Sequence, residues 1–189
     1  SAVERVEFSG GRVTGVLSRG ERKTADYYIS SLPFERLTAA APGFEASLDG
    51  FSHSPITGIH LWFDRPVTEL PHATLLDRTV PWMFNKSDGR YLQLVVSASR
   101  KLVEMSNGEV VEMALRELSE FFPAARSAKL EKAHVVKEVR ATFSAGPGLE
   151  SRRPTSRTAV PNFFLACDWT KSGWPASMEG AVRSGYLAA

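Results

Sequence analysis

The segment CDWTKSGWPASMEGAVRSGYLAA (167–189), which directly follows the apolar run NFFLA (162–166), decides the fold of this chain. The apolar run is typical of a short buried strand. Asp168 follows it, a turn passes through Gly173 and Pro175, and a helical pattern then continues. A helix N-terminus carries unpaired N–H groups and a partial positive charge, so it favours an electron-rich ligand atom. The order of strand, acidic residue, glycine turn and helix therefore predicts a ligand site here.

Small residues recur along this expected helix and would let a flat ring or another backbone approach it closely. They are Ala176, Ser177, Gly180, Ala181, Ser184 and Gly185. An aspartate at the end of a buried strand, as expected for Asp168, accepts hydrogen bonds from ribose hydroxyls or backbone N–H groups. The structural alternative is that Asp168 only caps a turn and Gly180 only eases helix packing. The local pattern leaves both interpretations open.

The first 32 residues predict a three-stranded meander. Apolar residues alternate on both sides of Gly10-Gly11, which is typical of two strands joined by a tight turn. A second reversal is expected at Gly20, and the apolar run 25–32 is the expected third strand. Such a meander is marginal alone, so we expect it to be the edge of a larger structure.

The central part of the sequence predicts a mixed sheet with helices. Ser106 and Glu109 form a capping box in front of a helix that Pro123 stops. A shorter helix is expected at 33–42, after Pro33. Strands are expected at 56–63, 75–76, 82–84, 91–97 and 134–143, and a loop at 146–158. The fold class is therefore mixed α/β, of the α+β type.

Composition excludes several classes of protein. The 189 residues carry 23 basic and 21 acidic side chains, for a formal net charge of +2. This balance gives no reason to expect a nucleic-acid partner. The single cysteine excludes a disulfide scaffold, and the four histidines lack metal-ligand spacing, so no metal site is expected. No stretch reaches the roughly 20 apolar residues of a membrane span, which leaves the cytoplasm as the expected location by elimination.

Several segments together resemble one family. Residues 167–189 are similar to the C-terminal flavin-binding signature of the FAD-dependent amine oxidase and phytoene desaturase superfamily. GRVTGVLSRGERKTADYYISSLPFERL (11–37) resembles the meander that closes its FAD domain, and ITGIHLWFDRPVT (56–68) with VPWMFNK (80–86) resembles its substrate-domain strands. The combination is most similar to the squalene-associated subgroup, the hydroxysqualene dehydroxylases of bacterial hopanoid synthesis.

The resemblance implies a division of the chain and a set of cofactor-binding residues. Residues 1–32 and 161–189 would be partial, Rossmann-like portions of an FAD-binding domain, and residues 33–160 a substrate-binding domain. Asp168 would lie near the ribityl chain and pyrophosphate of FAD. The turn Gly173, Trp174 and Pro175 would lie by the isoalloxazine ring, and Ser177, Met178 and Glu179 would form the helix turn aimed at its pyrimidine edge. Trp174 has a core aromatic role as its alternative.

Two features depart from the family pattern. Cys167 stands where the family usually has glycine, and it has no His or Lys neighbour in the sequence that would make it a nucleophile. No G-x-G-x-x-G follows any expected strand, since SGGRVTG (9–15) has the wrong spacing and lies in a hairpin. We therefore expect a piece of a longer flavoprotein, which alone holds FAD weakly and is inactive.

The substrate is less well defined. Apolar residues between 44 and 160 could wall a cavity for a long isoprenoid, although core packing is the favoured role for each of them. They are Phe44, Phe51, Trp62, Phe63, Leu75, Leu76, Trp82, Met83, Phe84, Leu92 and Leu94. Four polar residues, His60, Asp64, Arg65 and Asn85, could act on a hydroxyl leaving group, but strand ends and surface pairs are favoured. No catalytic residue is assigned, because the redox chemistry belongs to the cofactor.

The expected reaction is reductive dehydroxylation of hydroxysqualene to squalene. The alternatives are carotenoid desaturation of the phytoene type, amine oxidation and, from another class, a non-catalytic isoprenoid-binding module. The loop at 146–158 contains Arg152, Arg153 and Arg157, which could attract anionic lipid headgroups and give peripheral contact with the inner membrane. A solvated loop is the favoured alternative. Exposed sheet surface leaves self-association open as well.

Overall fold

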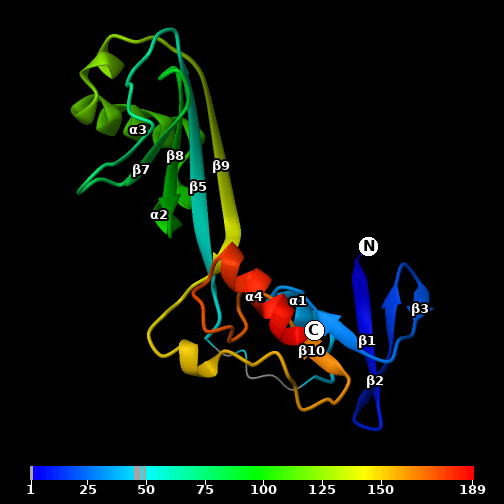
Figure 1. Cartoon of the computed structure of the whole chain (residues 1–189). Helices are drawn as coiled ribbons and strands as arrows, with labels where there is room; N and C mark the ends of the chain where they lie inside the picture. The colour runs from blue at the N-terminus through cyan, green and yellow to red at the C-terminus, as the bar shows by residue number, and fades with distance from the viewer. Residues whose placement is uncertain (1, 45–47, 49) are drawn as a thin grey trace. The chain divides into compact units, whose positions relative to one another are not determined.

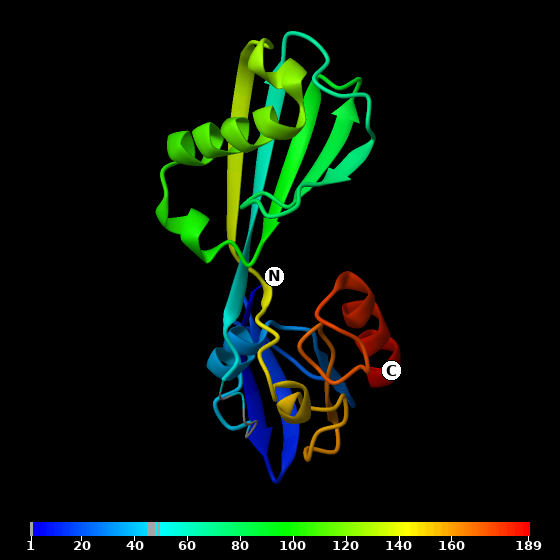
Figure 2. The ribbon, with the colours of Figure 1, turned by 90° about the vertical axis from the view of Figure 1, so that its left-hand side faces the viewer.

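The structure, a computed structural model, describes residues 2–44, 48 and 50–189. The chain forms two compact units, one made of residues 1–52 and 142–189 and the other of residues 53–141. We call them the terminal unit and the central unit. Figures 1 and 2 show the elements of both. Within the described residues, no helix is both long and apolar enough to cross a membrane.

The central unit is a five-stranded sheet with helices packed on one face. The strand order is β6-β7-β8-β5-β9. Its strands are β5 (His53–Phe63), β6 (His72–Thr74), β7 (Trp82–Ser87), β8 (Tyr91–Ser97) and β9 (Leu130–Phe143). Its helices are α2 (Arg100–Glu104), α3 (Asn107–Phe121) and the 3₁₀ turn η1 (Pro123–Arg126). Figure 2 shows α3 lying across the strands.

Hydrophobic periodicity builds this unit. In β5 every second residue from Pro55 to Phe63 is buried, as expected for a strand with one face on a core. The buried side of α3 includes Val110, Ala114 and Leu118. The residues of β5, β8 and α3 share one apolar cluster, so the sheet and the helix bury each other's apolar faces.

The predicted capping box is confirmed. The Ser106 hydroxyl accepts from the Glu109 N–H at 3.2 Å, and the Glu109 carboxylate accepts from the Ser106 N–H at 2.7 Å. These hydrogen bonds from Ser106 hold the pKa of Glu109 below its usual value.

The terminal unit is assembled from short elements that lie far apart in the sequence. Its strands are β1 (Val3–Ser9), β2 (Arg12–Ser18) and β3 (Glu21–Lys23), which form one sheet, and β4 (Tyr28–Ser30) with β10 (Phe163–Leu165), which pair in parallel. Its helices are α1 (Phe34–Ala40), the 3₁₀ turn η2 (Glu150–Arg152) and α4 (Met178–Ala188). One apolar cluster includes Leu37, Phe143, Leu149, Phe163 and Trp169.

The meander prediction is correct for its first two strands and wrong for its third. Positive φ angles at Arg19 (55°) and Gly20 (72°) give a two-residue turn, so the third strand is β3, directly after β2. The expected third strand at 25–32 contributes β4 to the other sheet, where Tyr28 N–H donates to the Asn162 carbonyl at 2.9 Å.

One strand boundary also differs from the sequence prediction. The strand expected at 75–76 lies at His72–Thr74 instead, because Asp77 adopts a positive φ of 56° and turns the chain just beyond it. Residues 33–52 and 142–160 belong to the terminal unit by their contacts, while the expected substrate-binding domain at 33–160 stays a prediction about function. Apolar side chains from both stretches join the cluster around Trp169.

Candidate functional site

The N-terminal end of α4 is the centre of the candidate site. Ser177 caps it, since its hydroxyl accepts from the Gly180 N–H at 3.1 Å and donates to the Pro175 carbonyl at 3.1 Å. The first two helical amides, of Met178 and Glu179, have no partner within a helix by geometry. Ser177, Met178 and Glu179 are exposed, Met178 to 89%. The end of the helix is therefore open to a ligand.

Two glycines shape the turn that leads into α4. Gly173 has a φ of 71°, a conformation that a side chain disfavours. A Cβ added to Gly180 would lie 2.5 Å from the Pro175 carbonyl oxygen. The turn thus folds back onto the first turn of the helix, and only glycine allows this approach. Easing close packing is one role of Gly180, as the structural alternative expects.

Asp168 is half-buried at the start of the same loop. Its Oδ2 accepts from Thr142 Oγ1 at 3.1 Å and its Oδ1 from Cys167 Sγ at 3.3 Å. A carboxylate has about four acceptor positions, so Asp168 keeps capacity for a further donor. Burial and the Asp168 carboxylate raise the pKa of the Cys167 thiol to about 11. Cys167 is therefore an inert thiol at neutral pH, in agreement with the sequence prediction that it is no nucleophile.

Trp174 lies outside the buried core. Its side chain is 42% exposed, and the Arg183 guanidinium lies 5.0 Å from the ring centroid. Arg183 Nη1 also lies 3.9 Å from Glu179 Oε1, one helical turn away. Among the described residues, Trp174 is therefore not part of a buried core.

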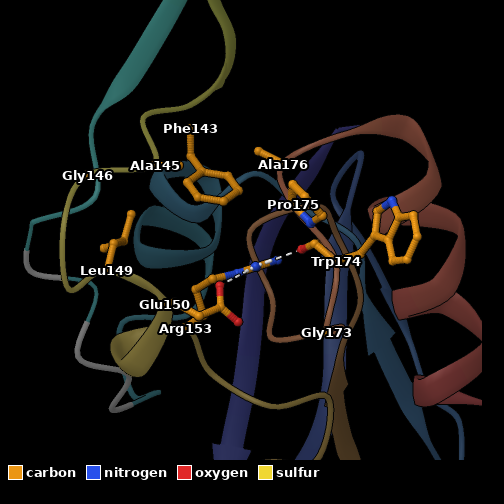
Figure 3. Close-up of a pocket in the computed structure, with 10 residues that line it drawn as sticks. All are labelled: Phe143, Ala145, Gly146, Leu149, Glu150, Arg153, Gly173, Trp174, Pro175 and Ala176. Carbon is orange, nitrogen blue, oxygen red and sulfur yellow. Dashed lines mark hydrogen bonds and ion pairs between the residues drawn. The ribbon is translucent and has the colours of Figure 1, made fainter.

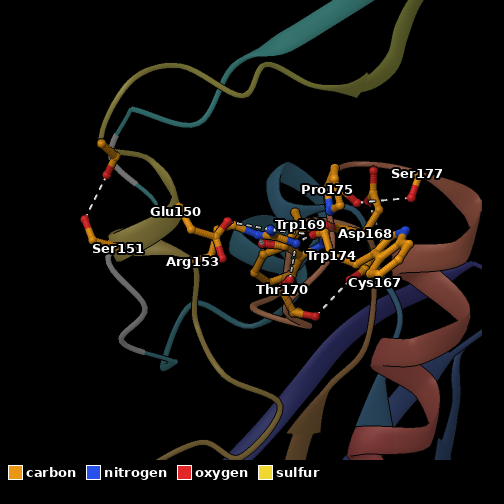
Figure 4. Close-up of polar contacts among 11 residues, drawn as sticks. Glu150, Ser151, Arg153, Cys167, Asp168, Trp169, Thr170, Trp174, Pro175 and Ser177 are labelled. Carbon is orange, nitrogen blue, oxygen red and sulfur yellow. Dashed lines mark hydrogen bonds and ion pairs between the residues drawn. The ribbon is translucent and has the colours of Figure 1, made fainter.

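Arg153 is the residue that sequence reasoning missed. A solvated position was expected for it, but it is only 5% exposed. Its guanidinium contacts the carboxylate of Glu150 at 2.6 Å and the backbone of the loop 168–174, as Figure 4 shows. Arg152 and Arg157, its neighbours in the sequence, are exposed. No local sequence pattern distinguishes the buried Arg153 from the exposed Arg152 and Arg157, because all three lie in the same polar segment.

A cavity of about 370 Å³ lies in the terminal unit beside this arginine. Phe143 and Leu149 form part of its apolar wall, and the turn Gly173, Trp174 and Pro175 forms another part (Figure 3). The structure therefore brings the predicted turn residues together at a concave surface. Asp168, Ser177, Met178 and Glu179 do not line this cavity.

The polar candidates of the central unit have structural partners. Asp64 and Arg65 pair with each other at 2.7 Å just after β5, and Arg65 with the Lys129 N–H lowers the pKa of Asp64 to about 2. Asn85 accepts from the Gly89 N–H at 2.9 Å in the turn after β7. These positions agree with the favoured interpretation of strand ends and surface pairs.

His60 lies on the face of the central sheet opposite the buried face, between the buried residues Ile59 and Leu61. Its Nδ1 is 2.8 Å from the Tyr91 hydroxyl, and the ring stacks near Trp62. Burial, then the charges of His134 and Lys86, lower the pKa of His60, so its neutral form is favoured. Among the described residues, no group of three His, Cys, Asp or Glu side chains is placed to hold a metal ion.

The apolar candidates divide between the two units and, within the central unit, between the core and the surface. Phe63, Leu75, Met83, Leu92 and Leu94 are buried in the central core, as favoured from the sequence. Trp82 and Phe84 are exposed to 43% and 38%, and Leu76 to 69%. Phe44 and Phe51 pack against the terminal core instead.

The family profile described as flavin containing amine oxidoreductase matches residues 1–189. The chain belongs to this family. Its members' shared cofactor is a flavin, so the resemblance seen in the C-terminal segment is confirmed at this level. The chain is thereby assigned to a family of flavin-dependent oxidoreductases.

The curated relatives that this chain matches include phytoene desaturases and a hydroxysqualene dehydroxylase. The 15-cis-phytoene desaturase of Synechococcus elongatus is 31% identical over 201 residues, which cover 94% of this chain and 42% of that protein. The hydroxysqualene dehydroxylase of Sinorhizobium fredii is 32% identical over 164 residues, which cover 87% of this chain and 38% of that protein. The chain thus spans less than half the length of these relatives.

Solved structures share the fold at low sequence identity. An oxidoreductase from Methanosarcina mazei matches with a TM-score of 0.69 at 16% identity, covering 96% of this chain and 47% of that chain. A putrescine oxidase matches with a TM-score of 0.65 at 17% identity, covering 97% and 46%. The mixed α/β fold class expected from the sequence is therefore confirmed.

The residues at the end of α4 fit a flavin. Two amides at its tip are without intrahelical partners, the capping serine bonds only to the Gly180 N–H of the helix, and Ser177, Met178 and Glu179 are exposed. The sequence signal that located this end of the chain was the small-residue motif itself.

Proposed function

We propose that this chain supplies the C-terminal part of the FAD site in an oxidoreductase acting on a long isoprenoid. The observation that carries the proposal is the open, serine-capped N-terminus of α4, next to the loop that starts at Asp168. A helix dipole stabilises negative charge at such an end by about 0.3–1 kcal/mol, and more where the site is partly buried.

The roles of the chain's own residues follow from their positions. The amides of Met178 and Glu179 would donate toward the electron-rich edge of the ring. Asp168 would accept from the ribityl chain or other donors of the cofactor. Gly173, Trp174 and Pro175 would lie beside the ring, and the ion pair of Glu179 with Arg183 directs that carboxylate along the helix.

We further propose that the reaction is the dehydroxylation of hydroxysqualene to squalene. When bound in reduced form, FAD supplies a hydride. The hydroxyl group would leave the allylic carbon as water after taking up a proton, and a hydrogen from that hydride would take its place. The hydroxysqualene dehydroxylase relative, at 32% identity, supports this substrate.

Desaturation of a carotenoid precursor is the second candidate. It is favoured by the phytoene desaturase relatives, which align with up to the whole of this chain at 27–32% identity. Desaturation removes a hydride and a proton from the isoprenoid, whereas dehydroxylation adds a hydride. The two candidates therefore differ in whether the flavin is reduced or oxidised by the substrate.

The test uses the longer protein that contains this chain, purified with its flavin. We expect a yellow preparation, and we expect Asp168→Ala to lose flavin while Asp26→Asn, at an exposed position of the same unit, retains it. A colourless wild-type protein, or full flavin content in Asp168→Ala, would contradict the proposal. Conversion of hydroxysqualene by the reduced enzyme, against conversion of phytoene by the oxidised enzyme, decides between the two substrates.

Three finer expectations belong to this proposal. The sequence of the chain has no G-x-G-x-x-G, so the chain on its own should hold FAD weakly and be inactive. Peripheral membrane contact and self-association stay predictions. The buried Arg153 cannot contribute to a basic lipid-binding surface, which leaves Arg152 and Arg157 for that role. The cytoplasmic location likewise stays a prediction.

A further inference from the structure

The guanidinium of Arg153 uses every one of its N–H groups on nearby partners. Nη1 donates to Glu150 Oε2 at 2.6 Å and to the Trp174 carbonyl at 2.8 Å. Nη2 donates to the carbonyls of Asp168, at 2.8 Å, and of Thr170, and Nε donates to the Trp169 carbonyl at 3.4 Å. Arginine has five such donors in a fixed plane, so this buried cation is fully paired.

Four of the five acceptors are backbone carbonyls of one loop. They belong to residues 168, 169, 170 and 174, which lie between β10 and α4 in neither a helix nor a strand. A buried carbonyl without a partner is costly, and a loop of this kind has no ladder to supply partners. The Arg153 side chain, from a segment 15 or more residues earlier, thus supplies the hydrogen bonds that these carbonyls would otherwise receive from a helix or a strand.

Two further contacts hold the arginine and its segment in place. The guanidinium lies 5.3 Å from the centroid of the Phe143 ring, which covers it from the side of the core. The next residue, Pro154, accepts from the Lys171 N–H at 2.8 Å, in the middle of the same loop. The segment 153–154 therefore holds the loop through the Arg153 side chain (Figure 4) and also through the Pro154 carbonyl.

We infer that Arg153 is a positioning residue of the flavin site: it fixes the loop 168–174, from which Asp168, Gly173 and Trp174 reach the cofactor. This inference rests on the proposed function, because the loop matters to catalysis only if a flavin lies beside it. The arginine itself acts through the backbone of the loop.

Lysine cannot take over this role. Its ammonium offers three donors at one point, whereas the acceptors around Arg153 are spread over the three guanidinium nitrogens. Arg153→Lys keeps the charge and leaves at least two acceptors unpaired. Arg152→Lys, at the exposed neighbouring position, is the matched control because it makes the same chemical change outside the hydrogen bonds that Arg153 donates to the loop.

The first readout needs no flavin. Lys171 is exposed in the middle of the loop, so trypsin cleavage after it, followed by mass spectrometry on the longer protein, reports whether the loop is held. We expect Arg153→Lys to speed this cleavage about tenfold, the effect of losing roughly one well-formed charged hydrogen bond. Cleavage in the central unit should be unchanged, and Arg152→Lys should behave as the wild type.

The second readout is flavin binding by the longer protein. Arg153→Lys should weaken FAD binding about tenfold and alter the absorbance envelope of the bound flavin, again in contrast to Arg152→Lys. Equal protection of Lys171 and equal FAD affinity in the two variants would overturn the inference. A wild type that binds no flavin would instead refute the proposed function, while the cleavage readout would still decide whether Arg153 holds the loop.

A third variant covers the case in which Arg153→Lys folds poorly. Arg153→Ala leaves a space that guanidinium ion, at millimolar and non-denaturing concentration, can fill. We expect guanidinium to restore both Lys171 protection and FAD binding, and ammonium of equal ionic strength to restore neither. A variant that folds but gains nothing from guanidinium over ammonium would contradict a positioning role for this group.

Discussion

The two units of the chain are built by different means. In the central unit, long strands alternate buried and half-buried residues, and one amphipathic helix covers the sheet. In the terminal unit the strands have three to seven residues, and buried polar side chains connect segments that lie far apart in the sequence. Apolar packing thus determines the first, whereas directed hydrogen bonds to the backbone determine much of the second.

Asn162 illustrates the second kind of construction. It is 2% exposed, its Oδ1 accepts from the Val13 N–H at 2.9 Å, and its Nδ2 donates to the Val13 carbonyl at 2.9 Å. Trp169 makes a similar link, because its Nε1 donates to the Leu32 carbonyl at 3.0 Å. Such links are specific in direction and distance, because each one requires a particular pair of polar atoms to lie within hydrogen-bond reach.

The largest expected loss of stability follows from removing core volume from the central unit, which we expect to depend mainly on apolar packing. Leu94, in β8, is fully buried in the apolar cluster of the central unit. Leu94→Ala should lower the free energy of unfolding by about 2–5 kcal/mol. Denaturant unfolding measures the loss, and amide exchange should locate it in the central unit. The control Ser97→Ala, at an exposed end of the same strand, should change stability by less than about 0.5 kcal/mol. Equal losses for both variants would refute apolar packing as the main support.

A smaller loss should follow from cutting a polar link in the terminal unit. Asn162→Ala leaves the N–H and carbonyl of Val13 buried without their partner, which should cost about 1–3 kcal/mol. Amide exchange should rise in β2 and leave the central strands protected. Asn107→Ala, at an exposed asparagine of α3, is the control and should have little effect. Unchanged exchange at Val13 in Asn162→Ala would count against the contrast between the units.

The two helix caps allow a finer comparison. Ser106→Ala removes one half of a reciprocal capping box, while Ser177→Ala removes a single hydrogen bond to the helix. Each should cost about 1 kcal/mol, with the larger loss at Ser106. Amide exchange at Glu109 and at Gly180 measures each cap separately. A larger loss at Ser177 would mean that the tip of α4 is more tightly held than its contacts indicate.

The last expected effect arises only at alkaline pH and is confined to the terminal unit. The pKa of Cys167 is about 11 in the folded chain, against a usual value of 9.0. Between these pH values the unfolded chain binds fewer protons than the folded one. The contribution of the Cys167 thiol to the free energy of unfolding is therefore fully present below pH 9.0 and is lost as the pH rises toward 11. Thiolate ultraviolet absorbance should titrate near pH 11, and Cys167→Ser should remove this part of the pH dependence. A thiolate that forms near pH 9.0 would contradict the burial described above.

Sequence reasoning succeeded where a local pattern carries the signal. The capping box of α3, the strand at 56–63 within β5, and the strand, turn and helix at the C-terminus could all be predicted, because each depends on residues close together in the chain. It failed at the third strand of the meander, because β4 pairs with β10, more than a hundred residues away. It failed at Arg153 for the same reason, since the acceptors of that side chain are backbone atoms, whose positions no residue type reveals.

The sequence by itself determined the family, through the resemblance of several segments to it. It also determined the fold class and the place of the C-terminal motif, since hydrophobic period and small-residue spacing are local properties of a chain. Only the tertiary structure decided which of three neighbouring arginines is buried, how the loop before α4 is held, and that the tip of this helix is open. Those outcomes depend on where the backbone carbonyls of Asp168, Thr170 and Trp174 come together around one guanidinium. That convergence is a property of the folded chain, because it requires segments separated in the sequence to lie within hydrogen-bond distance of each other.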